Sequence, residues 1–235
     1  LVRSRGLGDV YKRQHYERWK GQVSHSQEAS LMAEPVLQTP IAEEDARKLR
    51  LSDTVYVSGT MLTARDSAHR RALELVKAGR ELPVDFRGAV VFHCGPIAVE
   101  KGGRWEIVAA GPTTSTRMES LEADFLEATG ARIIVGKGGM GDRTTAAMQR
   151  LGAVYCAFTG GAAVLAANAV KSVKAAEWLD LGMPEALWVL EVEKFGPLIV
   201  TIDAHGNNMF TDLMKDLEMK RKELYSRIGV AQPGR

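Results

Sequence analysis

Cysteines, long apolar runs and an excess of one charge are all scarce in this sequence, and each shortage excludes a class of protein. The 235 residues include two cysteines, Cys94 and Cys156. Two are too few for a disulfide framework, and an iron–sulfur cluster usually needs three or four thiolates. No apolar run reaches the roughly 18–20 residues that span a bilayer. The formal net charge is +2, so nothing favours a nucleic-acid-binding or membrane-binding surface.

The remaining composition is that of an ordinary globular protein. Hydrophobic residues make up 45% and charged residues 26% of a chain long enough to bury a sizeable core. The few cysteines suit a reducing compartment. The sequence also lacks a positively charged start followed by an apolar segment, the pattern that directs secretion. We therefore expect a cytoplasmic protein.

The first 34 residues are polar, basic and aperiodic, and we expect residues 1–34 to form a disordered leader. Residues 9–14 read as the translation of an adapter used in preparing sequencing libraries. We interpret residues 1–14 as an assembly artefact and Met32 as the start, with a natural leader as the alternative. One folded domain over residues 35–211 and a C-terminal amphipathic helix and tail over residues 212–235 are expected to follow.

Strand-like and helix-like patterns alternate through the folded part. The predicted strands cover residues 37–41, 54–60, 89–94, 105–110, 133–135, 154–159, 188–192 and 198–202. The predicted helices cover residues 43–49, 61–77, 119–129, 144–151, 162–169 and 212–228. Thr63 or Asp66 is expected to cap the second of these helices. With a hairpin turn at residues 101–104, this order predicts an α/β fold with a mixed sheet.

Three glycine turns each follow a predicted strand, at Gly111, Gly136 and Gly160. Because ligands gather at the carboxyl ends of strands in open α/β sheets, we expect these turns to meet at one edge. Residues 111–118 combine a Gly-Pro turn, hydroxyl side chains and an arginine at a helix start. Free backbone N–H groups and the helix dipole favour an anion at such a start. With the second turn, this stretch predicts a small carboxylate-binding site.

Nucleotide binding is not indicated by these glycines. Residues 136–141 lack the spacing and the following hydroxyl residue of a Walker A loop. No GxGxxG motif follows the first strand, and the acidic residue of a dinucleotide site is also missing. The glycines around Lys137 are therefore interpreted as the mark of an unusual backbone turn.

Several motifs, in one order and spacing, resemble the β subunit of the iron–sulfur hydro-lyases, the family of class I fumarate hydratase and L(+)-tartrate dehydratase. The resemblance covers roughly residues 38–210 and is nearer to the tartrate dehydratases. The motifs are residues 63–71, 92–97, 111–120, 135–141, 181–185, 195–200 and 205–208. Their joint occurrence makes coincidence a poor explanation. It identifies residues 35–211 as a fumarase-type β catalytic domain.

The resemblance implies a swivelling β/β/α fold and a reaction that adds or removes water in a C4 dicarboxylate, most simply the dehydration of L(+)-tartrate to oxaloacetate. It also implies a 4Fe–4S cluster that acts as a Lewis acid on the substrate. In the family, three cysteines of the α portion hold this cluster, and this chain has no equivalent of that portion. We therefore expect a partner α subunit that carries the cluster, in an α2β2 assembly, and no metal ligands in this chain.

The resemblance also assigns catalytic roles. Thr113 matches the threonine proposed as the base, which needs a nearby cation because a neutral hydroxyl is a poor base. Lys137 matches a residue that could supply this cation or stabilise the charge formed when the proton leaves. The alternatives are that Thr113 only caps the following helix and that Lys137 is a surface lysine. Thr114 and Gly136 are expected to contact the substrate beside them.

Arg65 and Arg117 match arginines that bind substrate carboxylates, which a guanidinium can hold in a bidentate manner. An arginine in the first turn of a helix is otherwise unfavourable, and this conflict favours a function for Arg117. His69 lies four residues after Arg65 on one helical face and is predicted to orient it or the substrate. A structural role is the alternative for this histidine.

The other histidines and the cysteines stay undecided at this level. His93 is as compatible with a packed core position as with the site, and His205 could cap a helix or contact a partner. Cys94 and Cys156 lie in apolar strand patterns and are interpreted as core residues. Two further functions stay open. One is the β subunit of a class I fumarate hydratase, which acts on malate and fumarate; the other is a non-catalytic carboxylate-binding module.

Overall fold

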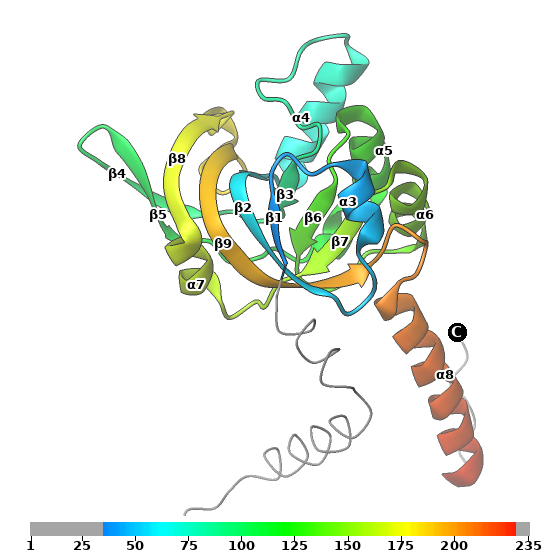
Figure 1. Cartoon of the computed structure of the whole chain (residues 1–235). Helices are drawn as coiled ribbons and strands as arrows, with labels where there is room; N and C mark the ends of the chain where they lie inside the picture. The colour runs from blue at the N-terminus through cyan, green and yellow to red at the C-terminus, as the bar shows by residue number, and fades with distance from the viewer. Residues whose placement is uncertain (1–34, 229–235) are drawn as a thin grey trace, which may run out of the picture. The chain divides into compact units, whose positions relative to one another are not determined.

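A seven-stranded mixed sheet dominates the part of the chain that the computed structural model describes, residues 35–228 (Figure 1). The predicted leader over residues 1–34 and the last seven residues, 229–235, lie outside the described residues. The strands in sheet order are β1 (Val36–Gln38), β2 (Thr54–Thr63), β3 (Val90–Phe92), β6 (Ile133–Gly136), β7 (Val154–Ala157), β9 (Leu187–Ile202) and β8 (Val170–Glu177). A separate hairpin joins β4 (Ile97–Lys101) to β5 (Arg104–Ala109).

The sheet closes on itself because β9 pairs with two strands that are not its neighbours in sequence. It runs antiparallel to β2 and antiparallel to β7, so that Ile199 is opposite Thr54 on one side and Ala157 on the other. The pairs β2–β3, β3–β6 and β6–β7 are all parallel. Four parallel strands therefore end at one edge of a ring closed by β9, and the loops after them lie at that edge.

Helices pack against both cores of the sheet. They are α3 (Glu43–Lys48), α4 (Asp66–Lys77), α5 (Glu119–Thr129), α6 (Asp142–Leu151), α7 (Ala163–Ala169) and α8 (Met209–Ile228), with short 3₁₀ turns η1 (Ser115–Met118) and η2 (Leu179–Leu181). In Figure 1, α4, α5 and α6 lie side by side along the outer face of β3, β6 and β7. The predicted α/β class, mixed sheet and C-terminal helix are confirmed. The swivelling β/β/α designation and the limits of the domain stay predictions.

Alternation along the buried strands separates two apolar cores. Val90 and Phe92 on β3 point into the ring, together with aromatic residues such as Phe195. Val91 and Ile134 point the other way, into the layer between the sheet and helices α4, α5 and α6. The residue after Phe92 is His93, which by the same alternation faces the helical layer.

Several predicted elements hold and others need correction. The helix predicted over residues 119–129 is α5, and Gly130 ends it in the left-handed conformation, with φ 70°. The two strands predicted at 188–192 and 198–202 are one strand, β9. Its positive φ at Lys194 and Gly196 bends the chain between its partners β8 and β7 without ending the strand. Strand β8 was not predicted.

The ends of two other helices also differ from expectation. The helix predicted from residue 61 starts at Asp66, because β2 continues to Thr63. Neither Thr63 nor Asp66 caps it: the N-cap position is Arg65 and its side chain makes no capping bond. The expected helix from residue 212 begins at Met209. Among the described residues, no helix is both long and apolar enough to cross a membrane.

Candidate active site

Two of the three glycine turns are joined by backbone hydrogen bonds. The N–H of Lys137 donates to the carbonyl of Thr113 at 3.2 Å, and the N–H of Ser115 donates to the carbonyl of Lys137 at 3.0 Å. The N–H of Thr113 donates to the carbonyl of His93, at the end of β3, at 2.6 Å. The turns after Gly111 and Gly136 therefore meet, as the sequence predicted, and they place Thr113, Thr114 and Lys137 together.

The third glycine turn lies beside them. A Cβ atom on Gly160 would lie 3.4 Å from Cδ of Lys137, so the lysine side chain runs past this turn. The carbonyl of Ala163 accepts a hydrogen bond of 3.0 Å from the N–H of Ala110, just before Gly111. All three glycine turns thus meet at one edge of the sheet.

Some of the backbone N–H groups that the sequence suggested for anion binding are engaged within the chain. The N–H groups of Thr113 and Ser115 are already bonded to carbonyls. Two neighbouring helix starts are also occupied by carboxylates of this chain. Glu119 accepts hydrogen bonds from the N–H of Gly141 at 2.6 Å and the hydroxyl of Thr144 at 2.8 Å, at the start of α6. Part of the backbone is therefore engaged within the chain, and the exposed cationic side chains are the further candidates for anion binding.

Glu185 fills the corresponding position at α4, and it also holds a candidate arginine. One carboxylate oxygen of Glu185 accepts from the N–H of Ser67 at 2.9 Å, and the other lies 3.2 Å from Nη2 of Arg65. A Cβ atom on Gly95 would lie 2.5 Å from Nη1 of Arg65, so the guanidinium packs against this glycine. Arg65 is therefore fixed at the end of β2, with 19% of its side chain exposed.

Arg117 lies on the same side of α4 and is more open. Its Nη2 donates to Asp66 at 2.6 Å, and 51% of its side chain is exposed. Because Asp66 directly follows Arg65, the two arginines flank the start of α4. The structure thus places both predicted carboxylate clamps near one helix end, each with a carboxylate partner.

Lys137 differs from the two arginines. Its side chain is exposed, and no carboxylate among residues 35–228 forms an ion pair with it. The side chain of Thr113 is half-buried and that of Thr114 is exposed. Neither threonine caps η1 or α5 with its side chain, which removes the capping alternative for Thr113. A threonine hydroxyl and an unpaired ammonium therefore share this edge.

Beneath these loops lies a buried cluster of His69, His93 and Glu122, whose side chains are fully enclosed. A carboxylate oxygen of Glu122 lies 3.1 Å from Nε2 of His93 and 3.4 Å from Nε2 of His69. These contacts have ion-pair distances, although their angles are poor for hydrogen bonds. Nδ1 of His69 bonds to the carbonyl of Arg65 at 2.9 Å.

The same cluster continues toward the Lys137 loop. Nδ1 of His93 lies 2.9 Å from Oγ of Ser115, which accepts a hydrogen bond of 2.9 Å from the hydroxyl of Tyr155. A Cβ atom on Gly136 would lie 2.0 Å from Oγ of Ser115, so only glycine fits there. Gly136 is therefore required by packing against the buried network, a reason that the sequence did not give.

The charges in the cluster follow from its burial and its pairing. Burial alone would raise the pKa of Glu122, but the two imidazoles lower it to about 2. Burial would lower the pKa of His69, but Glu122 and the Arg65 carbonyl outweigh it and raise this pKa. For His93 burial prevails, so its pKa is lowered. The lowered pKa of Glu122 and the raised pKa of His69 both favour an ion pair between these two groups, whereas burial favours the neutral form of His93.

Metal and cofactor binding can be tested against the donors present. The donor atoms of His69, His93 and Glu122 lie within 4.8 Å of one another, close enough to share an ion, and in this structure the carboxylate contacts both imidazoles directly. Cys94 and Cys156 are free and buried, and burial raises the pKa of each thiol to about 12. Two buried thiols do not fit a 4Fe–4S cluster.

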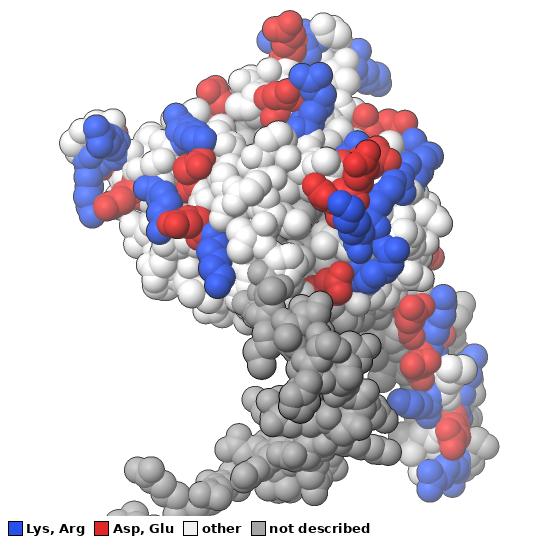
Figure 2. Space-filling view, viewed as in Figure 1, with Lys and Arg blue, Asp and Glu red and all other residues white. Residues whose placement is uncertain are grey.

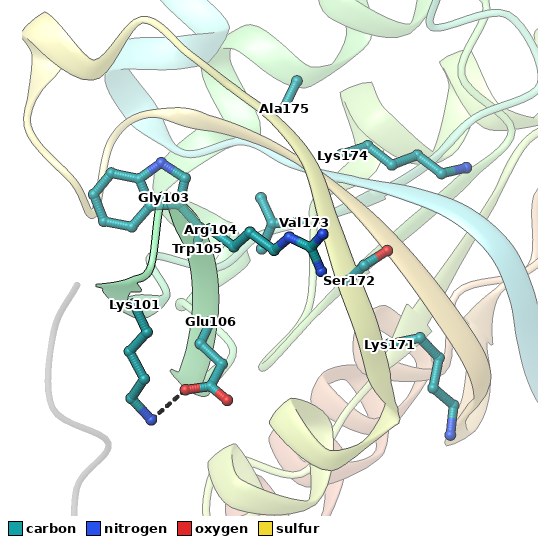
Figure 3. A pocket seen from close by; sticks show the side chains of 10 residues that line it. All are labelled: Lys101, Gly103, Arg104, Trp105, Glu106, Lys171, Ser172, Val173, Lys174 and Ala175. Carbon is teal, nitrogen blue, oxygen red and sulfur yellow. Dashed lines mark ion pairs between the residues drawn. The ribbon is translucent and has the colours of Figure 1, made fainter.

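A second cationic region lies away from this edge. A groove of about 590 Å³ between the β4–β5 hairpin and β8 is lined by Lys101, Arg104, Lys171 and Lys174, among others (Figure 3). Three of these cations already form ion pairs: Lys101 with Glu106, Lys171 with Glu193 and Lys174 with Glu191. Figure 2 shows the same interleaving of both charges over this face. The groove therefore offers no concentrated positive charge.

His205 is also placed away from the site. Its Nε2 lies 2.9 Å from the carbonyl of Arg47 and contacts the guanidinium of Arg50. Its N–H donates to the carboxylate of Asp203 at 3.0 Å. His205 therefore holds the turn after β9 against α3, where its side chain contacts a carbonyl in the last turn of that helix, a form of the capping that the sequence left open.

Several supporting residues of the site were not predicted from the sequence, namely Ser115, Glu122 and Tyr155 of the buried network and Glu185 beside Arg65. For Glu122 a signal was present. It lies four residues after Met118 and three before Phe125, which places a carboxylate on the buried stripe of α5. For Tyr155 and Glu185 no local signal existed, because their partners are distant in sequence.

Known proteins resemble this chain over most of its length. The family model described as fumarase C-terminus matches residues 9–213. The L(+)-tartrate dehydratase subunit beta of Escherichia coli strain K12 is 46% identical over 193 residues, which cover 82% of this chain and 94% of that protein. A protein of Methanocaldococcus jannaschii, "Putative L(+)-tartrate dehydratase subunit beta", is 43% identical over 185 residues, which cover 78% of this chain and 95% of that one.

A third relative is longer than this chain. The protein "Putative fumarate hydratase class I" of Geobacillus stearothermophilus is 40% identical over 180 residues, which cover 76% of this chain but 34% of that protein. The matched part of that relative is therefore a minor portion of a larger polypeptide. With the family model spanning most of the sequence, this chain belongs to the fumarase C-terminus family.

Proposed function

We propose that this chain is the β subunit of a hydro-lyase that dehydrates a C4 hydroxy-dicarboxylate, with L(+)-tartrate converted to oxaloacetate and water. The observation that carries this proposal is the joining of the Thr113 and Lys137 loops by backbone hydrogen bonds. It brings a hydroxyl and an ammonium without a described carboxylate partner to the edge where two arginines flank α4. Tartrate is favoured because relatives of that name match over nearly their whole length.

Each residue has a definite task in this proposal. Arg65 and Arg117 bind the two substrate carboxylates, and charge-assisted hydrogen bonds of this kind contribute roughly 1.5–3 kcal/mol each. Their present partners, Glu185 and Asp66, keep the guanidinium groups oriented. Thr113, ionised with the help of the nearby ammonium, takes the proton from the carbon next to a carboxylate; the C–H electron pair forms the C=C bond while the hydroxyl on the neighbouring carbon leaves and, with a proton, becomes the water released. Lys137 stabilises the negative charge that develops there, which lowers the barrier because the charge is greatest in the transition state.

Thr114, whose side chain is exposed, is assigned to the substrate side of the joined loops, whereas Gly136 is buried against Ser115 and shapes the loop from below in this proposal. His69 does not touch the substrate in this proposal, because it is buried beneath Arg65 and bonds to its carbonyl. The chain supplies carboxylate binding and proton removal. The proposal assigns the 4Fe–4S cluster to cysteines of a partner α subunit in an α2β2 assembly, since the two thiols here do not fit it.

The test is to co-express the chain with a candidate α subunit, an adjacent reading frame that encodes at least three well-separated cysteines, to reconstitute the pair with iron and sulfide without oxygen, and to assay L(+)-tartrate, malate and fumarate. We expect turnover of tartrate by the pair and none by this chain alone. Thr113→Val and Lys137→Met should each lower kcat/KM at least about tenfold, or ~1.4 kcal/mol. Thr116→Val, an exposed threonine of the same turn, is the matched control.

Two results would replace the proposal. Turnover of malate and fumarate in place of tartrate would identify a class I fumarate hydratase, which the Geobacillus relative makes the second candidate. Dicarboxylate binding with no turnover of any of the three by the reconstituted pair would favour a non-catalytic module. A coloured, active chain without a partner would contradict the division of the site between two subunits. The proposed cytoplasmic location can be checked by fractionation.

A further inference from the structure

The buried carboxylate of Glu122 connects two parts of the candidate site that are far apart in sequence. It lies on α5, and its two imidazole partners come from α4 and from the end of β3. All three side chains have no exposed surface. A buried ion pair is weak evidence for stability, because apolar side chains of the same volume often serve as well. Its presence here needs another reason.

One branch of the cluster leads to Arg65. His69 contacts Glu122 through Nε2 and the Arg65 carbonyl through Nδ1, so the ring spans from the carboxylate to the start of α4. Phe125 packs on the same ring, with 4.2 Å between ring centroids, and limits its rotation. The backbone of Arg65 is therefore held from below by a ring whose orientation depends on Glu122.

The other branch leads to Thr113 and Lys137. His93 contacts Glu122 through Nε2 and Ser115 through Nδ1, and its own carbonyl accepts the N–H of Thr113. Tyr155 closes this branch by donating to Oγ of Ser115, and its hydroxyl lies 3.1 Å from the carbonyl of Gly138. Both joined loops are thus tied to one imidazole.

We propose that Glu122, through His69 and His93, is a positioning residue that fixes Arg65 relative to Thr113 and Lys137. The proposal rests on the function proposed above and adds the device that aligns its parts. Glu122 touches no substrate. It holds the imidazole rings of His69 and His93 in one mutual orientation, with centroids 5.2 Å apart and planes at 72°. His69 in turn positions the backbone at Arg65, and His93 positions the loop that carries Thr113.

The negative charge of Glu122 matters because this carboxylate is in direct contact with both imidazoles, whose charge it balances. Asp66 on α4 acts on both histidines, and the ring of His69 faces that of His93. From β7, the hydroxyl of Tyr155 approaches, with a pKa raised chiefly by burial. With a neutral residue at position 122, His69 loses the carboxylate that keeps it protonated, and its hydrogen bond to the Arg65 carbonyl weakens.

The test compares Glu122→Gln with Glu127→Gln, a carboxylate one turn further along α5 that is exposed and paired with Arg150. In the reconstituted pair we expect Glu122→Gln to lower kcat at least about tenfold and to raise KM, because both the base and a carboxylate clamp move. Glu127→Gln should leave both constants unchanged. Tyr155→Phe, which removes one hydroxyl from the core, should lower kcat by a smaller factor.

A second measurement uses the full chain alone and does not depend on activity. Nitrogen NMR of labelled imidazoles should find one buried histidine still mostly protonated just above pH 6.5, where an ordinary histidine is mostly neutral. Glu122→Gln should abolish that signal and shift the backbone amides of residues 65–69 and 113–115. Glu127→Gln should do neither.

The outcomes separate the two proposals. If the wild-type pair turns over no dicarboxylate, the proposed function fails, while the NMR signal and the amide shifts still decide whether Glu122 positions the two loops. Equal kinetic constants for Glu122→Gln and Glu127→Gln would overturn the positioning role. Two neutral histidines in the wild-type chain would overturn it as well. If Glu122→Gln does not fold, unchanged kinetics in Tyr155→Phe and His93→Gln would contradict the proposal.

Discussion

The two cores of this domain differ in what they contain and in what depends on them. Inside the closed sheet, Phe92, Phe158 and Phe195 pack with ring centroids 5.2–6.0 Å apart. In the layer beneath α4 and α5, by contrast, Glu122 and its two histidines are buried among apolar side chains. The inner core is held by apolar contacts that many side chains could make. The helical layer also contains ion-pair and hydrogen-bond contacts, which depend on the direction of the interacting groups.

This difference indicates that the two cores have different roles. Apolar packing tolerates substitutions of similar volume, because the free energy depends on buried area and on cavities. A buried ion pair tolerates few substitutions, because removing one partner leaves the other as an unpaired buried charge. We therefore expect the inner core to govern stability and the helical layer to govern the geometry of the candidate site. Four changes test this contrast.

The largest effect should come from the inner core. Phe195→Ala removes a fully buried ring and should lower the free energy of unfolding by about 3–5 kcal/mol. The turnover of the molecules that remain folded should not change. Urea denaturation of the chain and assays of the pair at low temperature measure the two quantities. A loss of turnover that exceeds the loss of folded protein would break the contrast between the cores.

A smaller change in free energy, but a greater one in activity, is expected at the joined loops. Gly136→Ala places a Cβ atom 2.0 Å from Oγ of Ser115, and it should reduce kcat/KM at least about a hundredfold, or ~2.7 kcal/mol. Gly161→Ala is the matched control, because a Cβ atom there meets no described atom within 4 Å. Similar activity of the two variants would show that the contact with Ser115 is unimportant.

The pH dependence of stability should also distinguish the layers. The pKa of Glu122 is lowered to about 2 from an ordinary 4.5, so its contribution is present above pH 4.5 and is lost as the pH falls toward 2. The pKa of His69 is raised from 6.5, so its contribution is present below pH 6.5 and is lost as the pH rises through the folded value.

The difference in unfolding free energy between wild type and Glu122→Gln should therefore be greatest between pH 4.5 and 6.5 and decline on both sides. Denaturant titrations at a series of pH values measure it. The corresponding difference for Phe195→Ala should vary little with pH, because no charge is removed. A flat profile for Glu122→Gln would mean that no charged pair exists in the helical layer.

The smallest effect is expected on the outer surface of β8 and β9. Lys171 and Glu193 form an ion pair of 2.8 Å whose side chains are 52% and 69% exposed. Exposed pairs contribute little because water and salt screen them. Lys171→Met should leave the unfolding temperature and the kinetic constants of the pair unchanged. A clear loss of activity would show that the groove beside β8 takes part in function.

Much of the fold was predictable because local patterns determine it. The α5 boundaries followed from the apolar spacing and from Gly130, and the meeting of the glycine turns followed from their places after parallel strands. Strand β8 was missed because no residue of Val170–Glu177 is fully buried and its half-buried and exposed residues do not alternate clearly. Strand β9 was divided in two because Gly196 and Pro197 are typical of turns, whereas here they lie in a bend of one strand.

The site was predictable only for residues that motifs mark. Thr113, Lys137 and the two arginines stand in such motifs, and the structure places them around one edge. Ser115 and Tyr155 form their contacts across 40 residues of sequence, and no periodicity reports such a pairing. The carboxylate partners of the arginines were missed for the same reason. Long-range polar contacts need the tertiary structure, whereas helices and turns do not.

The closed ring of strands constrains the order in which this protein folds and assembles with a partner. The residues of the candidate edge come from the ends of β2, β3 and β6, and β9, near the end of the chain, closes the ring around them. Contacts between segments so far apart form late, because the chain must first close large loops. The surface that a partner subunit would meet is therefore completed only after nearly the whole domain has been synthesised, so that assembly follows folding.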